Sequence, residues 1–158
     1  MLNDETGKFL SFTLNNEIYC IDILRVEEIR GWEDVRSLPN TPEYMKGVLN
    51  FRGVVVPIVE LRVRFGMESI EYSPTTVTIV LSIESDQGKS MVGIVVDGVS
   101  DVLDIKAEDV LAAPRIGATI NNRFVQGVTT LEGQMVVLLD IDKIFNENEL
   151  DELSDLSE

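Results

Sequence analysis

The sequence predicts a mainly β fold built from two similar lobes of about five strands each. At 158 residues, the chain has the size of one compact unit or of two small lobes that share a core. Runs of β-branched and aromatic residues recur along it, and short segments with Gly, Asn or Pro separate them, as expected of strands joined by turns. A segment near the end of the chain also repeats an earlier one, which indicates two related halves.

The chain is expected to begin with a β-hairpin. Residues 9–14 and 18–23 are rich in β-branched and aromatic residues, and Asn15 and Asn16 lie between them. Asparagine tolerates the positive φ angles that a tight two-residue turn requires. We therefore expect two antiparallel strands here, with further strand over residues 26–31.

A second hairpin is expected around Arg52. Residues 32–47 carry two prolines and predict a loop or a short helix, and apolar runs lie on both sides of Arg52 and Gly53. Because arginine disfavours positive φ and glycine adopts it, a type II turn, or a type I turn with a glycine bulge, fits this pair better than a type I′ turn. Pro57 lacks a backbone donor, which predicts an edge strand or a strand irregularity at that residue.

The polar segment 66–75 contains a glycine and a proline and is expected to join the two halves. After it, residues 76–83 and 90–103 again have the composition of strands. Residues 101–114 show a mixed apolar pattern, which fits a strand and then a short helical turn that ends before Pro114.

An internal repeat relates the two halves. Residues 47–65 and 127–145 align at a constant offset of 80, and the identical pairs are Gly47/Gly127, Val48/Val128, Gly53/Gly133, Val56/Val136 and Phe65/Phe145. Residues 19–24 and 94–99 align at an offset of 75 through Asp22 and Asp97. A repeat of this length in a β pattern favours two small barrels packed on one another, against the alternative of chance similarity among valine-rich strands.

These observations place the lobes at roughly residues 9–65 and 76–145 and leave open an exchange of strands between them. The last residues, 151–158, are acidic and are expected to be disordered.

The charge at the Arg52 turn does not repeat. The equivalent position, 80 residues later, is Glu132. A turn whose geometry demanded arginine would carry a similar residue in both lobes, so the reversal favours a contact of Arg52 with a partner. The alternative is a solvated turn charge with no task.

Composition excludes several kinds of function. The chain has a net charge of −15, which repels nucleic acid and anionic lipid. It has no histidine and a single cysteine, Cys20, in an apolar stretch, so disulfides, Cys/His zinc sites, a Ser-His-Asp triad and a phosphoacceptor histidine are excluded. No phosphate-binding glycine loop is present. The composition therefore singles out no catalytic residue, no metal site and no cofactor site, and a catalytic pair of carboxylates cannot be picked out among the 28 acidic residues.

Four stretches together match one known family and cover nearly the whole chain. They are "FTLNNEIYCIDILRVEEIRG" (12–31), "LPNTPEYMKGVLNFRGVVVPIVELRVRFG" (38–66), "GIVVDGVSDVL" (93–103) and "VQGVTTLEGQMVVLLDIDKIF" (125–145). The chain resembles the CheW-type chemotaxis coupling proteins. That family usually reads Asn-Leu-Arg-Gly where this chain has Asn50-Phe51-Arg52-Gly53, which is a conservative change.

The resemblance implies a fold and a function. It implies one CheW-like domain over residues 1–150, made of two five-stranded SH3-like β-barrels with a shared hydrophobic interface. Such a protein is a non-enzymatic adaptor that binds the cytoplasmic tip of methyl-accepting chemoreceptors and the regulatory domain of the histidine kinase CheA. It is monomeric alone, works within a larger array, binds no nucleic acid and does not insert into the membrane.

The resemblance also assigns partner-binding residues. Asn50, Phe51 and Arg52 fall on the family's motif turn, near its receptor and kinase contacts. Val26 and Glu28 fall on a strand of the first lobe implicated in partner binding. The second-lobe part of the groove for the receptor helix is represented by Gly93, Val99 and Val102, and plain core packing is the alternative for the two valines.

The expected location is the cytoplasm, with recruitment to the inner face of the membrane through the receptors. No stretch is long and apolar enough to span a membrane, and the polar N-terminus lacks the layout of a secretory signal. The alternative function is a small acidic β-barrel that binds a small molecule or an oligosaccharide between the lobes, although few aromatic residues are available for sugar stacking. An enzyme with paired carboxylates is the remaining alternative.

Overall fold

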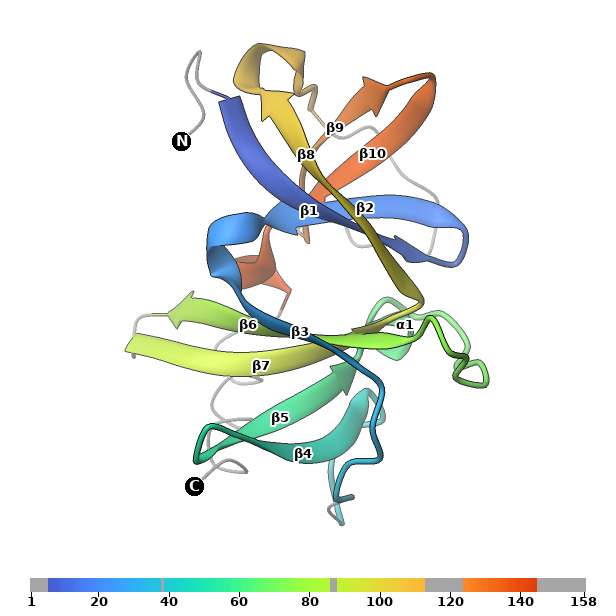
Figure 1. The fold of residues 1–158 in the computed structure, drawn as a ribbon, viewed down its shortest axis with the longest axis vertical. Helices are drawn as coiled ribbons and strands as arrows, with labels where there is room; N and C mark the ends of the chain where they lie inside the picture. The colour runs from blue at the N-terminus through green and yellow to red at the C-terminus, as the bar shows by residue number, and fades with distance from the viewer. Residues whose placement is uncertain (1–5, 38, 86–87, 113–123, 145–158) are drawn as a thin grey trace.

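The computed structural model describes residues 6–37, 39–85, 88–112 and 124–144, and these form two five-stranded sheets. Sheet I has the strand order β8-β1-β2-β10-β9, and sheet II has the order β3-β6-β7-β5-β4. Figure 1 shows sheet I in the upper half of the molecule and sheet II in the lower half. The prediction of a mainly β fold with two groups of five strands is therefore confirmed.

The strands follow one another along the chain with short helical turns between some of them. They are β1 (Thr6–Leu14), β2 (Glu17–Asp22), β3 (Val26–Gly31), β4 (Met45–Phe51), β5 (Val54–Glu60), β6 (Val77–Ser85), β7 (Gly88–Val96), β8 (Gly98–Lys106), β9 (Val125–Leu131) and β10 (Gln134–Leu139). The helical turns are η1 (Ile23–Arg25), α1 (Leu61–Arg64), η2 (Ala107–Asp109) and η4 (Ile141–Lys143). The helical turn predicted after β8 is η2, and the loop 32–44 contains no helix among its described residues.

Each sheet combines strands from both halves of the chain. The strands β1 and β2 lie in sheet I, and β3, β4 and β5 lie in sheet II; the second half then repeats this order, with β6 and β7 in sheet II and β8 to β10 in sheet I. The chain therefore crosses between the sheets twice, through η1 after β2 and at Asp97 after β7.

The two edges of each sheet meet at an isolated bridge. In sheet II, Arg36 follows β3 and pairs with Val48 of β4, and in sheet I, Leu111 follows β8 and pairs with Val128 of β9. The backbone N–H groups and carbonyls of each pair exchange two hydrogen bonds of 2.8–3.2 Å. A glycine precedes each bridged valine, which lets the two backbones approach closely.

The core lies mainly between the sheets. A central cluster joins apolar side chains from both of them, and a smaller cluster fills the other face of each sheet. A row of aromatic rings crosses the centre, with centroid distances of 5.9 Å for Phe12–Tyr19, 6.1 Å for Tyr19–Phe65 and 5.6 Å for Phe65–Phe124. Because apolar burial is the main favourable term in folding, this shared core holds the two sheets as one unit.

Of the two alternatives predicted from Pro57, the edge position is wrong, and a strand irregularity lies beside it, where the register of β4 and β5 shifts between Met45 and Gly47 opposite Ile58 and Val59. Pro57 lies in β5, which pairs with β4 on one side and with β7 on the other. The parallel ladder with β7 begins at Ile58, one residue later, so the missing donor falls just outside that ladder.

Candidate partner-binding surfaces

The β4–β5 turn displays three of the residues predicted from the sequence. Arg52 has φ of 52° and Gly53 has φ of 84°, and Phe51 pairs with Val54 across the two-residue loop. Positive φ at both central residues defines a type I′ turn, so the type II or bulged type I turn expected from the sequence is wrong. Asn50 Oδ1 accepts a hydrogen bond from the Gly53 N–H at 3.1 Å and so supports the turn.

Two guanidinium groups flank the ring of Phe51. The Phe51 side chain is buried, whereas Arg52 is exposed and its Cζ lies 4.7 Å from the ring centroid. Arg30 of β3 approaches the same ring at 5.9 Å. Stacking of this kind holds a flexible cation in place and leaves its polar atoms available to a ligand.

Arg30 connects a second predicted residue to this turn. Its Nε donates to Glu28 Oε2 at 2.6 Å, and both side chains are roughly 70% buried. Glu28 and Arg30 alternate along β3 and so lie on the same face of the strand. The residues Glu28, Arg30, Asn50, Phe51 and Arg52 together are called the Arg52 surface below. Sequence reasoning missed Arg30, although its spacing from Glu28 could have indicated it.

The other predicted residues lie apart from the Arg52 surface. Val26 begins β3 and packs, half-buried, against the central cluster, as does Val99 of β8. Gly93 is buried in β7, where an added Cβ would lie 2.5 Å from Ile58 Cδ1. Val102 is 51% exposed on β8 in sheet I.

Val102 lines a hollow in sheet I that the sequence did not predict. The hollow has a volume of about 570 Å³, with Ile18, Val102, Leu103, Leu131 and Val136 as apolar lining and Asp101, Asp104 and Glu132 as acidic lining. Lys8 Nζ neutralises Asp104 in part, at 2.8 Å. This set of lining residues is called the Val102 surface below. It includes Glu132, the counterpart of Arg52, so the equivalent turns of the two sheets present opposite charges.

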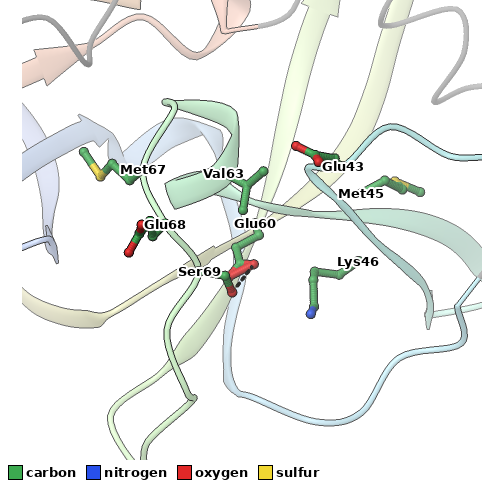
Figure 2. Close-up of a pocket in the computed structure, with 8 residues that line it drawn as sticks. All are labelled: Glu43, Met45, Lys46, Glu60, Val63, Met67, Glu68 and Ser69. Carbon is green, nitrogen blue, oxygen red and sulfur yellow. Dashed lines mark hydrogen bonds between the residues drawn. The ribbon is translucent and has the colours of Figure 1, made fainter.

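A second hollow, of about 500 Å³, lies beside α1 (Figure 2). Figure 2 shows the side chains of Glu60 and Ser69 pointing toward one another, and Ser69 Oγ donates to the buried Glu60 carboxylate at 2.5 Å. This bond ties the segment that joins the two halves to the end of β5. The described residues contain no group of three or more His, Cys, Asp or Glu residues that could hold a metal ion.

Burial favours the neutral forms of Cys20 and Tyr19. Burial raises the pKa of the Cys20 thiol to about 12. Burial, aided by the charge of Glu17, raises the pKa of Tyr19 to about 12. A thiol with a raised pKa is a poor nucleophile at neutral pH.

Comparisons with known proteins agree on one family. The CheW-like domain family matches residues 8–149. The chain is 47% identical over 143 residues to the chemotaxis protein CheW of Klebsiella aerogenes, covering 90% of this chain and 84% of the relative. It is 35% identical over 142 residues to CheW of Rhizobium meliloti, covering 90% of this chain and 89% of the relative.

A solved structure shows the same fold. The chain superposes on the scaffolding protein TtCheW of Thermoanaerobacter tengcongensis with a TM-score of 0.81 and 28% sequence identity, covering 92% of this chain and 96% of the other. Within the described part of the chain, no helix is long and apolar enough to cross a membrane.

Proposed function

The chain belongs to the CheW family, and on that premise we propose that it holds its partners through the Arg52 surface and the Val102 surface. It is a non-enzymatic adaptor that couples chemoreceptors to the histidine kinase CheA in chemotaxis. The partner sites proposed for it are the cytoplasmic tip of the receptors and the regulatory domain of the kinase. Its proposed location is the cytoplasm, at the inner face of the membrane, where receptors recruit it.

The proposal rests on the charge of Arg52, in a strained turn whose counterpart carries the opposite charge. A non-glycine residue in the left-handed region costs about 1 kcal/mol or more, and asparagine is the side chain that adopts it most readily. Arg52 occupies this region at φ of 52°. Backbone strain of this kind is concentrated at functional sites. Because the equivalent turn carries Glu132 in the same conformation, the fold itself does not require a cation there.

Coupling needs two surfaces in a fixed relation rather than a chemical step. The affinity of one contact must depend on the conformation of the partner, and apolar area with charges at its rim provides affinity and selectivity together. The Arg52 surface combines a buried ring with two cations, and the Val102 surface combines apolar lining with carboxylates. Modest contacts at both surfaces would add up through the avidity of an array.

The test is Arg52→Glu, with Glu132→Arg as a matched variant in the equivalent turn. Substitution at an exposed turn usually changes stability by about 0.5 kcal/mol or less, so both proteins should keep the melting temperature of the wild type. Co-sedimentation with receptor-containing membranes and CheA should fall at least fivefold for Arg52→Glu. The loss should be largest at low ionic strength, because Arg52 is exposed and salt screens the contacts of exposed charges.

The Glu132→Arg variant tests the Val102 surface, which Glu132 lines. In the same co-sedimentation assay it should weaken the partner contacts made by that surface and leave those made by the Arg52 surface. A folded Arg52→Glu protein that assembles as the wild type does would contradict the proposed role. An unfolded one would return Arg52 to a structural role. The proposal extends to Val26, Val99 and Gly93 as partner-binding residues, with core packing as the alternative for Val99.

A further inference from the structure

Two ion pairs occupy the places where the chain crosses between the sheets. The first joins Arg25 of η1 to Asp142 of η4. The two terminal guanidinium nitrogens donate to the two carboxylate oxygens, Nη1 to Oδ1 at 2.9 Å and Nη2 to Oδ2. Arg25 Nη1 also donates to the Ser82 carbonyl at 2.8 Å, and Asp142 Oδ1 accepts from the Glu84 N–H at 3.0 Å. This cluster, called joint one, connects the end of sheet I, the first crossing and β6 of sheet II.

The second ion pair lies at the other crossing. Arg62 of α1 donates through Nε and Nη2 to the two oxygens of Asp97, at 2.9 and 3.0 Å. Asp97 Oδ2 also accepts from the N–H of Asn15, in the β1–β2 turn, at 2.8 Å. This cluster, called joint two, connects the end of sheet II, the second crossing and a turn of sheet I.

The joints occupy similar places in the two halves and have reversed polarity, although the strand ladders make Gly98, and not Asp97, the counterpart of Arg25. Arg62 and Asp142 are 80 residues apart, and each lies in the helical turn that follows the last strand of its half. Arg25 and Asp97 each follow the second strand of their half. In joint one the helical turn supplies the carboxylate, and in joint two it supplies the guanidinium. The same connection between the sheets is therefore built twice, with the charges exchanged.

Both pairs have the geometry of strong, directional contacts. Each is bidentate and partly buried, with the Arg62 side chain 11% exposed and the Arg25 side chain 21% exposed. Two parallel charge-assisted hydrogen bonds fix orientation as well as distance. Hydrogen bonding to Asp142 and to Asp97 raises the pKa of Arg25 and of Arg62, respectively, so both guanidinium groups stay charged.

We propose that Arg25, Asp142, Arg62 and Asp97 are positioning residues, which fix the angle between the two sheets and thereby set the Arg52 surface relative to the Val102 surface. The proposal rests on the proposed function, because it concerns how the two partner surfaces are held. The shared core is apolar and non-directional, so it holds the sheets together without hydrogen bonds that fix one orientation. The bidentate ion pairs of the joints add contacts of fixed direction between the sheets. Loosening one joint leaves both surfaces intact and changes only their relation.

The test compares Arg25→Asp, Asp142→Arg and the double variant, which gives joint one the polarity of joint two. Spin labels at Lys89→Cys in sheet II and Gln126→Cys in sheet I report the distance between the sheets. Both positions are exposed, and the native Cys20 is buried and resists labelling. Each single variant should broaden the distance distribution, and the double variant should narrow it again.

The functional measurement is the receptor-dependent activation of CheA. Binding of each variant to receptor-containing membranes and to CheA alone is measured separately. Each single variant should bind each partner within twofold of the wild type and lose activation at least fivefold. The double variant should recover part of the activation, because it restores the ion pair but not the hydrogen bonds to the Ser82 carbonyl and the Glu84 N–H. Asp142→Asn is the milder variant, with a smaller loss in the same direction, should the charge reversals fail to fold. Lys143→Gln removes a neighbouring exposed pair, 3.8 Å from Asp140, and should change nothing.

Full activation in a folded single variant, an unchanged distance distribution or a double variant that recovers nothing would each overturn the proposal. Loss of binary binding in step with activation would also overturn it, because the residues would then act in folding or in contact. Failure of the wild type to bind either partner would instead overturn the proposed function, and the distance measurement would still show whether the joints hold the sheets.

Discussion

The β4–β5 hairpin of sheet II and the β9–β10 hairpin of sheet I have the same backbone and opposite charges. Arg52 and Glu132 have φ of 52° and 50°, and the glycines that follow them have φ of 84° and 79°. The first strand of each hairpin carries a glycine directly before the valine of an isolated bridge. The residues that repeat at an offset of 80 thus maintain the fold, whereas the residues that do not repeat distinguish the two surfaces.

The symmetry must fail where the two halves meet. Arg64 lies between the rings of Tyr44 and Phe124, at 5.4 and 5.0 Å, and these two residues are themselves 80 positions apart. Its Nη2 donates to the carbonyl of Ile144, the counterpart of Arg64, at 2.6 Å. Only one arginine side chain fits between these two rings, so one half supplies arginine and the other supplies isoleucine. The repeat therefore has a structural exception as well as functional ones.

The largest effect should come from Gly47→Ala, which breaks the bridge of sheet II. An added Cβ would lie 2.3 Å from the Arg36 carbonyl oxygen, so the backbone itself must move. We expect a loss of about 3 kcal/mol in the free energy of unfolding, measured by urea denaturation. Gly127→Ala should cost somewhat less, because its Cβ would lie 2.8 Å from the Leu111 oxygen and its closest contact, 2.5 Å, is a methyl group of Val110.

Gly31→Ala is the matched control, since its Cβ would meet nothing within 4 Å. It should leave stability within about 0.5 kcal/mol of the wild type. A Gly47→Ala protein as stable as Gly31→Ala would show that the close approach at the bridge does not constrain the sheet.

The strands were predictable from the sequence, but their assignment to sheets was not. Apolar runs and turn residues indicate where strands lie, and the repeat is the same whichever sheet each strand joins. The alignment of residues 19–24 with 94–99 through the two aspartates is wrong. Cys20 pairs with Leu138 and Gly93 pairs with Ile58, and these partners are 80 apart, so the ladders make Cys20 the counterpart of Gly93.

The site was predictable in part. The turn with Arg52 is visible in the sequence because its charge fails to repeat, but its conformation is not. Local preference favours a turn that spares arginine from positive φ, whereas a two-residue hairpin between twisted strands favours type I′. Arg30 and the acidic hollow depend on contacts between strands far apart in the chain. Such contacts leave no local pattern.

The next largest effect is the response of stability to alkaline pH, which differs between the two sheets. Sheet I carries a titratable thiol, Cys20, where sheet II has Gly93. The pKa of Cys20 is about 12 in the folded protein and 9.0 as its ordinary value. Below pH 9 both states hold the proton, and above pH 9 only the unfolded state releases it. The free energy of unfolding should therefore fall as pH rises, by about 1.4 kcal/mol at pH 10.

Denaturation in urea at pH 8, 9 and 10 measures this slope. In Cys20→Ala the fall between pH 8 and 10 should be smaller by about 1.4 kcal/mol, and the part due to Tyr19 and Tyr72, whose pKa values are also raised, should remain. The variant should be less stable at every pH because of the lost packing. An equal slope in both proteins would show that another group, such as Tyr19, governs the alkaline transition.

The smallest effect is expected for substitutions at the two turns themselves, Arg52 and Glu132. Asparagine adopts positive φ more readily than arginine or glutamate, so Glu132→Asn should raise the free energy of unfolding by about 1 kcal/mol. Arg52→Asn should raise it by less, about 0.5 kcal/mol or below, because it also removes the contact of the guanidinium with the Phe51 ring. That contact, at 4.7 Å, has no counterpart at Glu132 among the described residues. Urea denaturation of the two variants in parallel measures the difference.

Equal gains in the two variants would mean that the ring contact adds nothing to stability. A loss above about 1 kcal/mol in Arg52→Asn would make Arg52 a structural residue. An Arg52→Asn protein that is at least as stable as the wild type but fails to assemble with receptor and kinase would show that the arginine serves a partner, at the expense of the turn that holds it.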